Sequence, residues 1–162
     1  MQNETTFEAV DYPHPFDEAA ARLCQSTRRY VAILSPELDP AAFDCEALAD
    51  ALRKLLTESA QSEVRILIRN PAAMLGRGHR LLYLARRLPS RIHVRRLREH
   101  PDWKDETVMI FDRDAVLFKP AGSLDRAFWE QEAPASAQQR LELFDSLWRY
   151  AEEDPDIRGL SV

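Results

Sequence analysis

The fold is decided by the stretch Thr107-Val-Met-Ile-Phe-Asp-Arg-Asp-Ala-Val-Leu-Phe118, in which two apolar runs flank a short polar turn. Apolar runs of this length, rich in β-branched and aromatic side chains, are typical of strands. The polar residues 112–114 between them leave room only for a tight connection. The stretch therefore predicts a β-hairpin.

Upstream of the hairpin, short apolar runs alternate with stretches of helical spacing. Continuous apolar runs suit strands that are buried on both faces, and amphipathic stretches suit helices that cover those faces. Asp44 is expected to cap one helix, and Ser136 with Gln139 forms a capping box for the last one. The pattern predicts an α/β sandwich with a mixed, largely parallel sheet. The expected strands are 30–34, 64–68 and 92–97, and the expected helices are 17–27, 44–59, 81–88 and one from 136 onward.

Composition is typical of a single globular domain. The 162 residues are 45% apolar and 30% charged, with 22 basic and 27 acidic side chains and a net charge of −5. This acidic balance argues against a wholly basic nucleic-acid-binding domain. No apolar run reaches the ~18 residues of a membrane span, so we expect a cytoplasmic protein with no membrane contact. We expect an N-terminal extension and helix over 1–27 and one α/β domain over 28–162.

Several well-known catalytic motifs are absent from the sequence. Four glycines cannot supply a dinucleotide fingerprint, and Gly76-Arg-Gly78 is not followed by the Gly-Lys-Ser/Thr of a phosphate-binding loop. There is no Gly-x-Ser-x-Gly elbow and no His-Glu-x-x-His helix. Neither the four histidines nor Cys24 and Cys45 have metal-ligand or redox spacing, so we expect no cofactor and no metal.

The order of the expected elements, with the segment 105–112 and its hairpin, resembles one half of a phospholipase D superfamily protein. The motif of that family is His-x-Lys-x-x-x-x-Asp, in which the histidine attacks phosphorus and the lysine neutralises the phosphate oxygens. The corresponding residues in this sequence are Asp105, Thr107 and Asp112. The family's Gly-Ser-x-Asn element is also displaced, because Gly122-Ser-Leu-Asp125 lies too late and ends in Asp.

The motif is therefore degenerate. A carboxylate at Asp105 would repel a phosphodiester, and the hydroxyl of Thr107 cannot replace a positive charge. The resemblance thus implies a catalytically inactive domain that acts as a binding or accessory module. Two alternatives stay open, namely an enzyme with a remodelled site for a small anionic substrate and a purely structural interaction protein. The remodelled site would lie near Ser35, Arg69, Asp105, Thr107 and Asp112.

The resemblance also implies partners. Similar small domains occur attached to bacterial N-acetyltransferases, and short members of the superfamily pair as identical chains about a twofold axis. We therefore expect a homodimer with Trp103, Asp105 and Phe128 near its axis. The motif-bearing strands are expected to leave an apolar surface exposed for that contact.

Charge is distributed unevenly along the chain. Residues 64–98 contain ten arginines and no acidic residue, whereas the other 127 residues carry a net charge of −15. If the arginines of 64–98 converge, they form a site for a polyanion such as nucleic acid, or for an acidic protein partner. Alternatively, the acidic tail 152–156 folds back onto them, and a ratio of 19 arginines to 3 lysines points to codon bias. The candidates for anion binding are Arg69, Arg77, Arg80 and Arg95.

Overall fold

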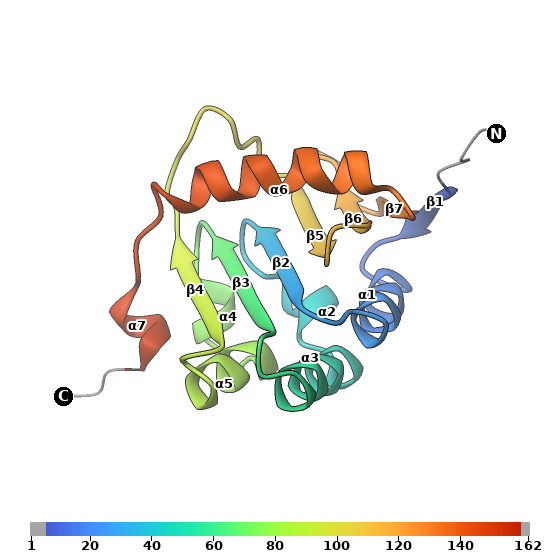
Figure 1. The fold of residues 1–162 in the computed structure, drawn as a ribbon. Helices are drawn as coiled ribbons and strands as arrows, with labels where there is room; N and C mark the ends of the chain where they lie inside the picture. The colour runs from blue at the N-terminus through green and yellow to red at the C-terminus, as the bar shows by residue number, and fades with distance from the viewer. Residues whose placement is uncertain (1–5, 160–162) are drawn as a thin grey trace.

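A seven-stranded mixed sheet runs through the middle of the protein in a computed structural model, which describes residues 6–159 (Figure 1). The strand order is β1-β7-β6-β5-β2-β3-β4. The strands are β1 (Thr6–Asp11), β2 (Tyr30–Ser35), β3 (Glu63–Ile68), β4 (Ile92–Arg96), β5 (Thr107–Phe111), β6 (Ala115–Lys119) and β7 (Arg126–Gln131).

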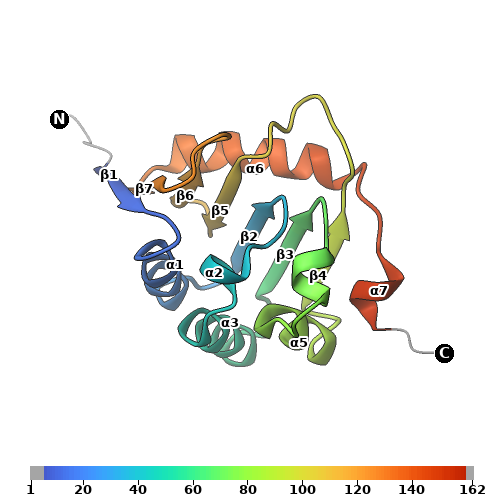
Figure 2. The ribbon, with the colours of Figure 1, turned by 180° about the vertical axis from the view of Figure 1, so that it is seen from behind.

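Helices cover both faces of this sheet, so the expected α/β class is confirmed. Helices α1 to α5 lie on one face and the long helix α6 crosses the other, as Figure 1 and the view from behind in Figure 2 show. Within residues 6–159, no helix is long and apolar enough to cross a lipid bilayer. The helices are α1 (Phe16–Gln25), α2 (Pro40–Phe43), α3 (Glu46–Glu58), α4 (Ala72–Leu75), α5 (Arg80–Arg87), α6 (Pro134–Trp148) and α7 (Pro155–Arg158).

Parallel pairing is confined to β2, β3 and β4. The other four neighbouring pairs are antiparallel. The expectation of a largely parallel sheet is therefore wrong. The reason is that the hairpin β5–β6, which the sequence predicted correctly, continues into two further antiparallel strands, β7 and β1.

The strands β1 and β7 were not expected from the sequence. They pair with each other from Thr6↔Gln131 to Asp11↔Arg126, which ties the N-terminal segment to the edge of the sheet. Both strands mix charged and apolar residues and lie at or next to an edge, where the apolar pattern that marks a central strand is weak.

Two predicted helix caps are wrong. Helix α6 begins at Pro134 with Ala133 as its N-cap, so Ser136 lies inside the first turn and forms no capping box. Proline is favoured in the first turn because its missing N–H would be unsatisfied there anyway. Helix α3 begins after Cys45, and the carboxylate of Asp44 instead accepts a hydrogen bond of 3.0 Å from the backbone N–H of Arg80.

The sheet has a large core on one face and a smaller core on the other. The large core packs α1, α3 and α5 onto the sheet around Phe16, Phe43 and Ile66. The smaller core packs Phe144 and Leu147 of α6 onto the other face. All five residues of β5 are buried, so the apolar surface expected for a dimer contact is covered by α6 on one face and by the large core on the other.

Candidate functional site

The first motif position, Asp105, lies at one end of the central strands, where β2 and β3 end and β5 begins. Asp105 lies in the turn before β5 with a φ of +68° and a side chain that is 53% exposed. Its carboxylate forms an ion pair with the guanidinium of Arg69, which follows β3. The guanidinium carbon of Arg69 also lies 4.6 Å from the centre of the Trp103 ring. The positive charge of Arg69 is thus paired with Asp105, and one face of its guanidinium lies against the Trp103 ring.

The second motif position is closed to ligands. Thr107 is the first residue of β5 and is only 3% exposed. Beside it, Glu106 is also buried, and its carboxylate accepts a hydrogen bond of 2.9 Å from the backbone N–H of Lys104. The indole of Trp103 donates to the carbonyl of Glu106 at 3.1 Å. A hydroxyl under these packed groups cannot contact a phosphate at the edge of the sheet.

Ser35 and His79 lie at the same end of the central strands, where both are neutral and bond to loop backbone groups. The hydroxyl of Ser35 is buried and accepts a hydrogen bond of 3.1 Å from the backbone N–H of Leu38. His79 is 2% exposed, and its Nδ1 accepts a hydrogen bond of 3.1 Å from the backbone N–H of Leu81. The ring proton is therefore on Nε2, which donates to the carbonyl of Leu38 at 3.1 Å. Burial lowers the pKa of His79, so its ring stays neutral. Both residues hold loops in place.

The third motif position lies at the opposite end of β5. The carboxylate of Asp112 accepts three hydrogen bonds from successive backbone N–H groups, those of Arg28, Arg29 and Tyr30, at 3.0, 2.9 and 3.1 Å. This arrangement fixes the start of β2 against the hairpin turn. The length of β5 separates Asp112 from Asp105, so the two carboxylates do not form one site.

The structure does not bring the four candidate arginines together. Arg80 begins α5 and pairs with Asp44 at 3.1 Å. Arg95 lies on the opposite face of the sheet, where it donates to the carbonyl of Trp148 at 3.2 Å and lies 4.4 Å from the centre of that ring. Arg77 lies between α4 and α5, is exposed, and forms no hydrogen bond or ion pair within the described part of the chain. Arg69 is held by Asp105, as described above.

The acidic tail does return to the arginine-rich stretch, but to other arginines. Arg96 exchanges two backbone hydrogen bonds with Glu152 and pairs with Asp154 at 3.4 Å. The guanidinium of Arg86 donates to the carbonyls of Ile157 and Asp156 at 3.0 and 2.7 Å. These contacts fasten the tail along β4.

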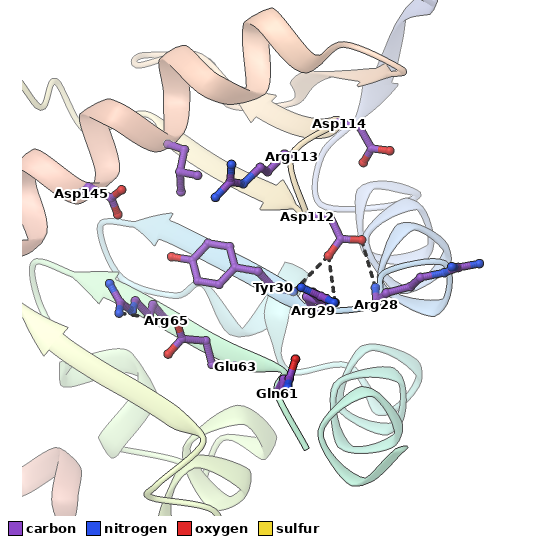
Figure 3. A pocket seen from close by; sticks show the side chains of 11 residues that line it. Arg28, Arg29, Tyr30, Gln61, Glu63, Arg65, Asp112, Arg113, Asp114 and Asp145 are labelled. Carbon is purple, nitrogen blue, oxygen red and sulfur yellow. Dashed lines mark hydrogen bonds and ion pairs between the residues drawn. The ribbon is translucent and has the colours of Figure 1, made fainter. Parts of the chain in front are cut away.

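A cleft that sequence reasoning missed lies at the amino ends of β2 and β3, under α6 (Figure 3). It has a volume of about 700 Å³ and is lined by residues from β2, β3, the β5–β6 turn and α6. Tyr30 and Arg65 stood in predicted strands, and no sequence signal distinguished them from other strand residues. Among residues 6–159, no group of three or more histidine, cysteine or acidic side chains is arranged to hold a metal ion.

Comparison with solved structures identifies the class of fold. A phospholipase D family member, Nuc from Salmonella typhimurium, superposes with a TM-score of 0.67 at 14% identity, over 93% of this chain and 99% of Nuc. The archaeal chromatin protein TrmBL2 gives 0.67 at 14% identity, over 95% of this chain and 57% of TrmBL2. Phosphatidylserine synthase from Haemophilus influenzae gives 0.62 at 12% identity, over 100% of this chain but 43% of the synthase. The protein therefore has a phospholipase D-like fold, as its element order predicted.

The sequence family is more specific than the fold. The chain belongs to the family described as Domain of unknown function (DUF7931), whose model matches residues 12–160. No curated protein matches it. At 12–14% identity, the solved structures establish the fold and leave the activity to be argued from the site.

Proposed function

We propose that this protein is a catalytically inactive phospholipase D-like domain that acts as a binding or accessory module. The observation that carries the proposal is the ion pair between Asp105 and Arg69 at the first motif position. A carboxylate occupies the place of the family's histidine, and the nearest cation is neutralised by it. Thr107 is buried and uncharged, so no side chain at either position can attack or neutralise a phosphodiester.

The alternative of a remodelled enzyme has less support. It needs Arg69 to bind a small anionic substrate, but Asp105 and Trp103 already occupy the guanidinium. Ser35 would have to act as a polar contact, but its hydroxyl is buried and bonded to the backbone of Leu38. A substrate would have to displace a charged partner before any reaction could begin.

A phosphodiesterase assay tests the proposal directly. The purified chain should hydrolyse a chromogenic phosphodiester no faster than buffer, with or without a chelator. Asp105→Asn and the exposed control Arg77→Ala should both give the same background. Turnover that is lost in Asp105→Asn and kept in Arg77→Ala would overturn the proposal, because it would make Asp105 part of an active site.

We propose a protein rather than a polyanion as the partner of the 64–98 stretch. Arg69, Arg80 and Arg96 of this stretch are paired with carboxylates of the same chain, which reduces the positive charge that a polyanion would meet. The similar protein TrmBL2 binds DNA, so nucleic acid is the appropriate comparison. Duplex DNA and single-stranded RNA should both fail to bind at low salt. Salt-dependent binding that is lost when Arg69, Arg77, Arg80 and Arg95 are replaced together would favour the polyanion.

We further propose that two copies associate in the cytoplasm as a homodimer, and that a separate N-acetyltransferase is one partner to test. Nuc, which this chain matches almost end to end, has one unit of this size, whereas the synthase is more than twice as long. Of the residues expected near the axis, Trp103 is 2% exposed and lies under Arg69, whereas Asp105 is accessible. Light scattering should give about 37 kDa, twice the 18.7 kDa of one chain. A mass of one chain at tens of micromolar would contradict the dimer.

A further inference from the structure

The cleft under α6 is separate from Asp105, which lies at the opposite end of the central strands. It opens at the amino ends of β2 and β3, where Asp112 rather than Asp105 ends the motif strand. Its volume of about 700 Å³ is within the range of pockets that hold small molecules. Figure 3 shows Tyr30, Arg65 and Asp145 directed toward a common space, with Arg113 reaching over it from the β5–β6 turn.

Two polar atoms on the wall of this cleft are buried without a hydrogen-bond partner, the hydroxyl of Tyr30 and the Nε of Arg65. Arginine Nε is only a donor, and burial raises the pKa of the Tyr30 hydroxyl, which therefore keeps its proton to donate. Unpaired buried donors of this kind are rare in folded proteins. The Nε of Arg65 can be satisfied only by an acceptor, and the hydroxyl of Tyr30 can donate to the same group.

The residues that line the cleft include as many arginines as carboxylates, but not all of these side chains are free to meet a ligand. The carboxylate of Asp112 is already used by three backbone N–H groups, and Glu63 pairs with Arg65 at 3.5 Å. The side chains of Arg28 and Asp114 point away from the cleft in Figure 3.

The cations that remain on the cleft are Arg113 and Arg29, against the single carboxylate of Asp145. The side chains of these three residues form no hydrogen bond or ion pair within residues 6–159. Two of these three side chains that are free to meet a ligand are therefore cations, within a lining whose arginines and carboxylates are equal in number.

We propose that this cleft binds a small ligand that carries a phosphate group. Tyr30 and Arg65 donate to the phosphate oxygens from the wall, and Arg113 closes over them from the hairpin turn. A phosphate fits better than a carboxylate because it presents three acceptor oxygens and close to two negative charges to this set of donors. Asp145 opposes the phosphate charge and so limits its affinity.

Calorimetric titration with inorganic phosphate and with glycerol phosphate, against acetate as the carboxylate control, tests the site. The unmodified chain should bind both phosphate probes and bind acetate at least about tenfold more weakly. Arg113→Ala should weaken phosphate binding about tenfold, and Asp145→Asn should strengthen it about fivefold because a repulsive charge is removed. Arg77→Ala, an exposed cation outside the cleft, should leave binding unchanged.

Tyr30→Phe separates ligand binding from folding. Because the hydroxyl has no partner in the folded chain, its removal should leave the urea midpoint unchanged or raise it, while phosphate binding falls about fivefold. A lower midpoint with unchanged binding would overturn the proposal, because the hydroxyl would then have a structural partner. Equal effects of Arg113→Ala and Arg77→Ala would also overturn it. Duplex DNA that binds more tightly than the phosphate probes and is lost in Arg113→Ala would overturn the assignment to a small ligand.

Discussion

The polar side chains at the two ends of the central strands differ in how far they are paired within the protein. At the carboxyl ends of β2 and β3, the side chains of Ser35, His79 and Asp105 are paired within the protein, and the Nε of Arg69 is buried without a partner in the described part of the chain. His79 bridges two loops, and Arg69 is paired with Asp105. At the amino ends, Tyr30 and Arg65 are buried with unpaired donor atoms, and Arg113 is free above them.

This difference matters because the first of these ends carries Asp105 and Thr107, the first two positions of the motif by which the fold was anticipated. The resemblance directs attention to Asp105 and Thr107, yet Thr107 is buried there, and the unpaired Nε of Arg69 belongs to a guanidinium that Asp105 already holds. Within residues 6–159, two of the three buried polar side-chain atoms that lack a partner, those of Tyr30 and Arg65, lie at the other end of the same strands. The motif positions are thus a poor guide to where unpaired polar groups gather in this chain.

The largest effect is expected at the closed end, from His79→Ala. The change removes the hydrogen bond to the carbonyl of Leu38 and the cap on the N–H of Leu81, and it leaves a cavity in a site that is 2% exposed. We expect a loss of about 3 kcal/mol of unfolding free energy, measured by urea denaturation. The exposed His14→Ala is the control and should change the unfolding free energy far less. Equal effects of the two changes would show that the closed end does not depend on this bridge.

The next largest effect is expected at the open end, from Asp112→Ala. Three backbone N–H groups lose their acceptor, and alanine must adopt the φ of +52° at this position. Because the site is partly exposed, water replaces some of the lost bonds, and we expect a loss of about 2 kcal/mol. Asp114→Ala, on the same turn and with no such bonds, should be nearly neutral. If both variants unfold at the same urea concentration, Asp112 does not hold the start of β2.

A smaller effect is expected from Arg69→Ala at the closed end. The change removes a partly exposed ion pair to Asp105 and the stacking on Trp103, which together contribute about 1 kcal/mol. Arg77→Ala should be within about 0.3 kcal/mol of the unmodified chain. The difference between these two variants should shrink in 1 M salt, because screening weakens the ion pair. A difference that does not change with salt would assign the whole effect to stacking.

A further effect is expected from pH, acting through His79. Burial is the main cause of its lowered pKa; Arg80 adds to the shift, whereas Asp44, Asp39 and the Leu38 carbonyl oppose it. The unfolded chain therefore takes up a proton before the folded chain does. Stability from this residue is present above about pH 6.5 and falls as the pH decreases below that value, by at most about 1.4 kcal/mol per pH unit.

Urea denaturation at pH 7 and pH 5, compared with His79→Gln, isolates this contribution. The unmodified chain should lose more stability than the variant over this interval, because glutamine takes up no proton. An identical loss in both proteins would show that His79 has the same pKa in the folded and unfolded chains.

Local patterns in the sequence were sufficient for the central part of the fold. The hairpin at 107–118, the apolar runs of β2 and β3 and the helices that cover them follow from periodicity over a few neighbouring residues. The same patterns could not show that β5 runs antiparallel to β2, since strand direction leaves no trace in an apolar run. Strands β1 and β7 were missed because each is stabilised by the other across more than a hundred residues.

The sequence by itself determined the phospholipase D-like class and the identity of Asp105 and Thr107 at the motif positions, because these depend on residue type and element order. Tertiary structure alone decided that Arg69 meets Asp105, that the arginines of 64–98 separate onto different layers, and that Tyr30 and Arg65 share the wall of a cleft. The physical reason is that a hydrogen bond or ion pair depends on a distance of a few ångströms between groups that are far apart in the chain. Such distances are set only when the sheet and its two helical layers have packed.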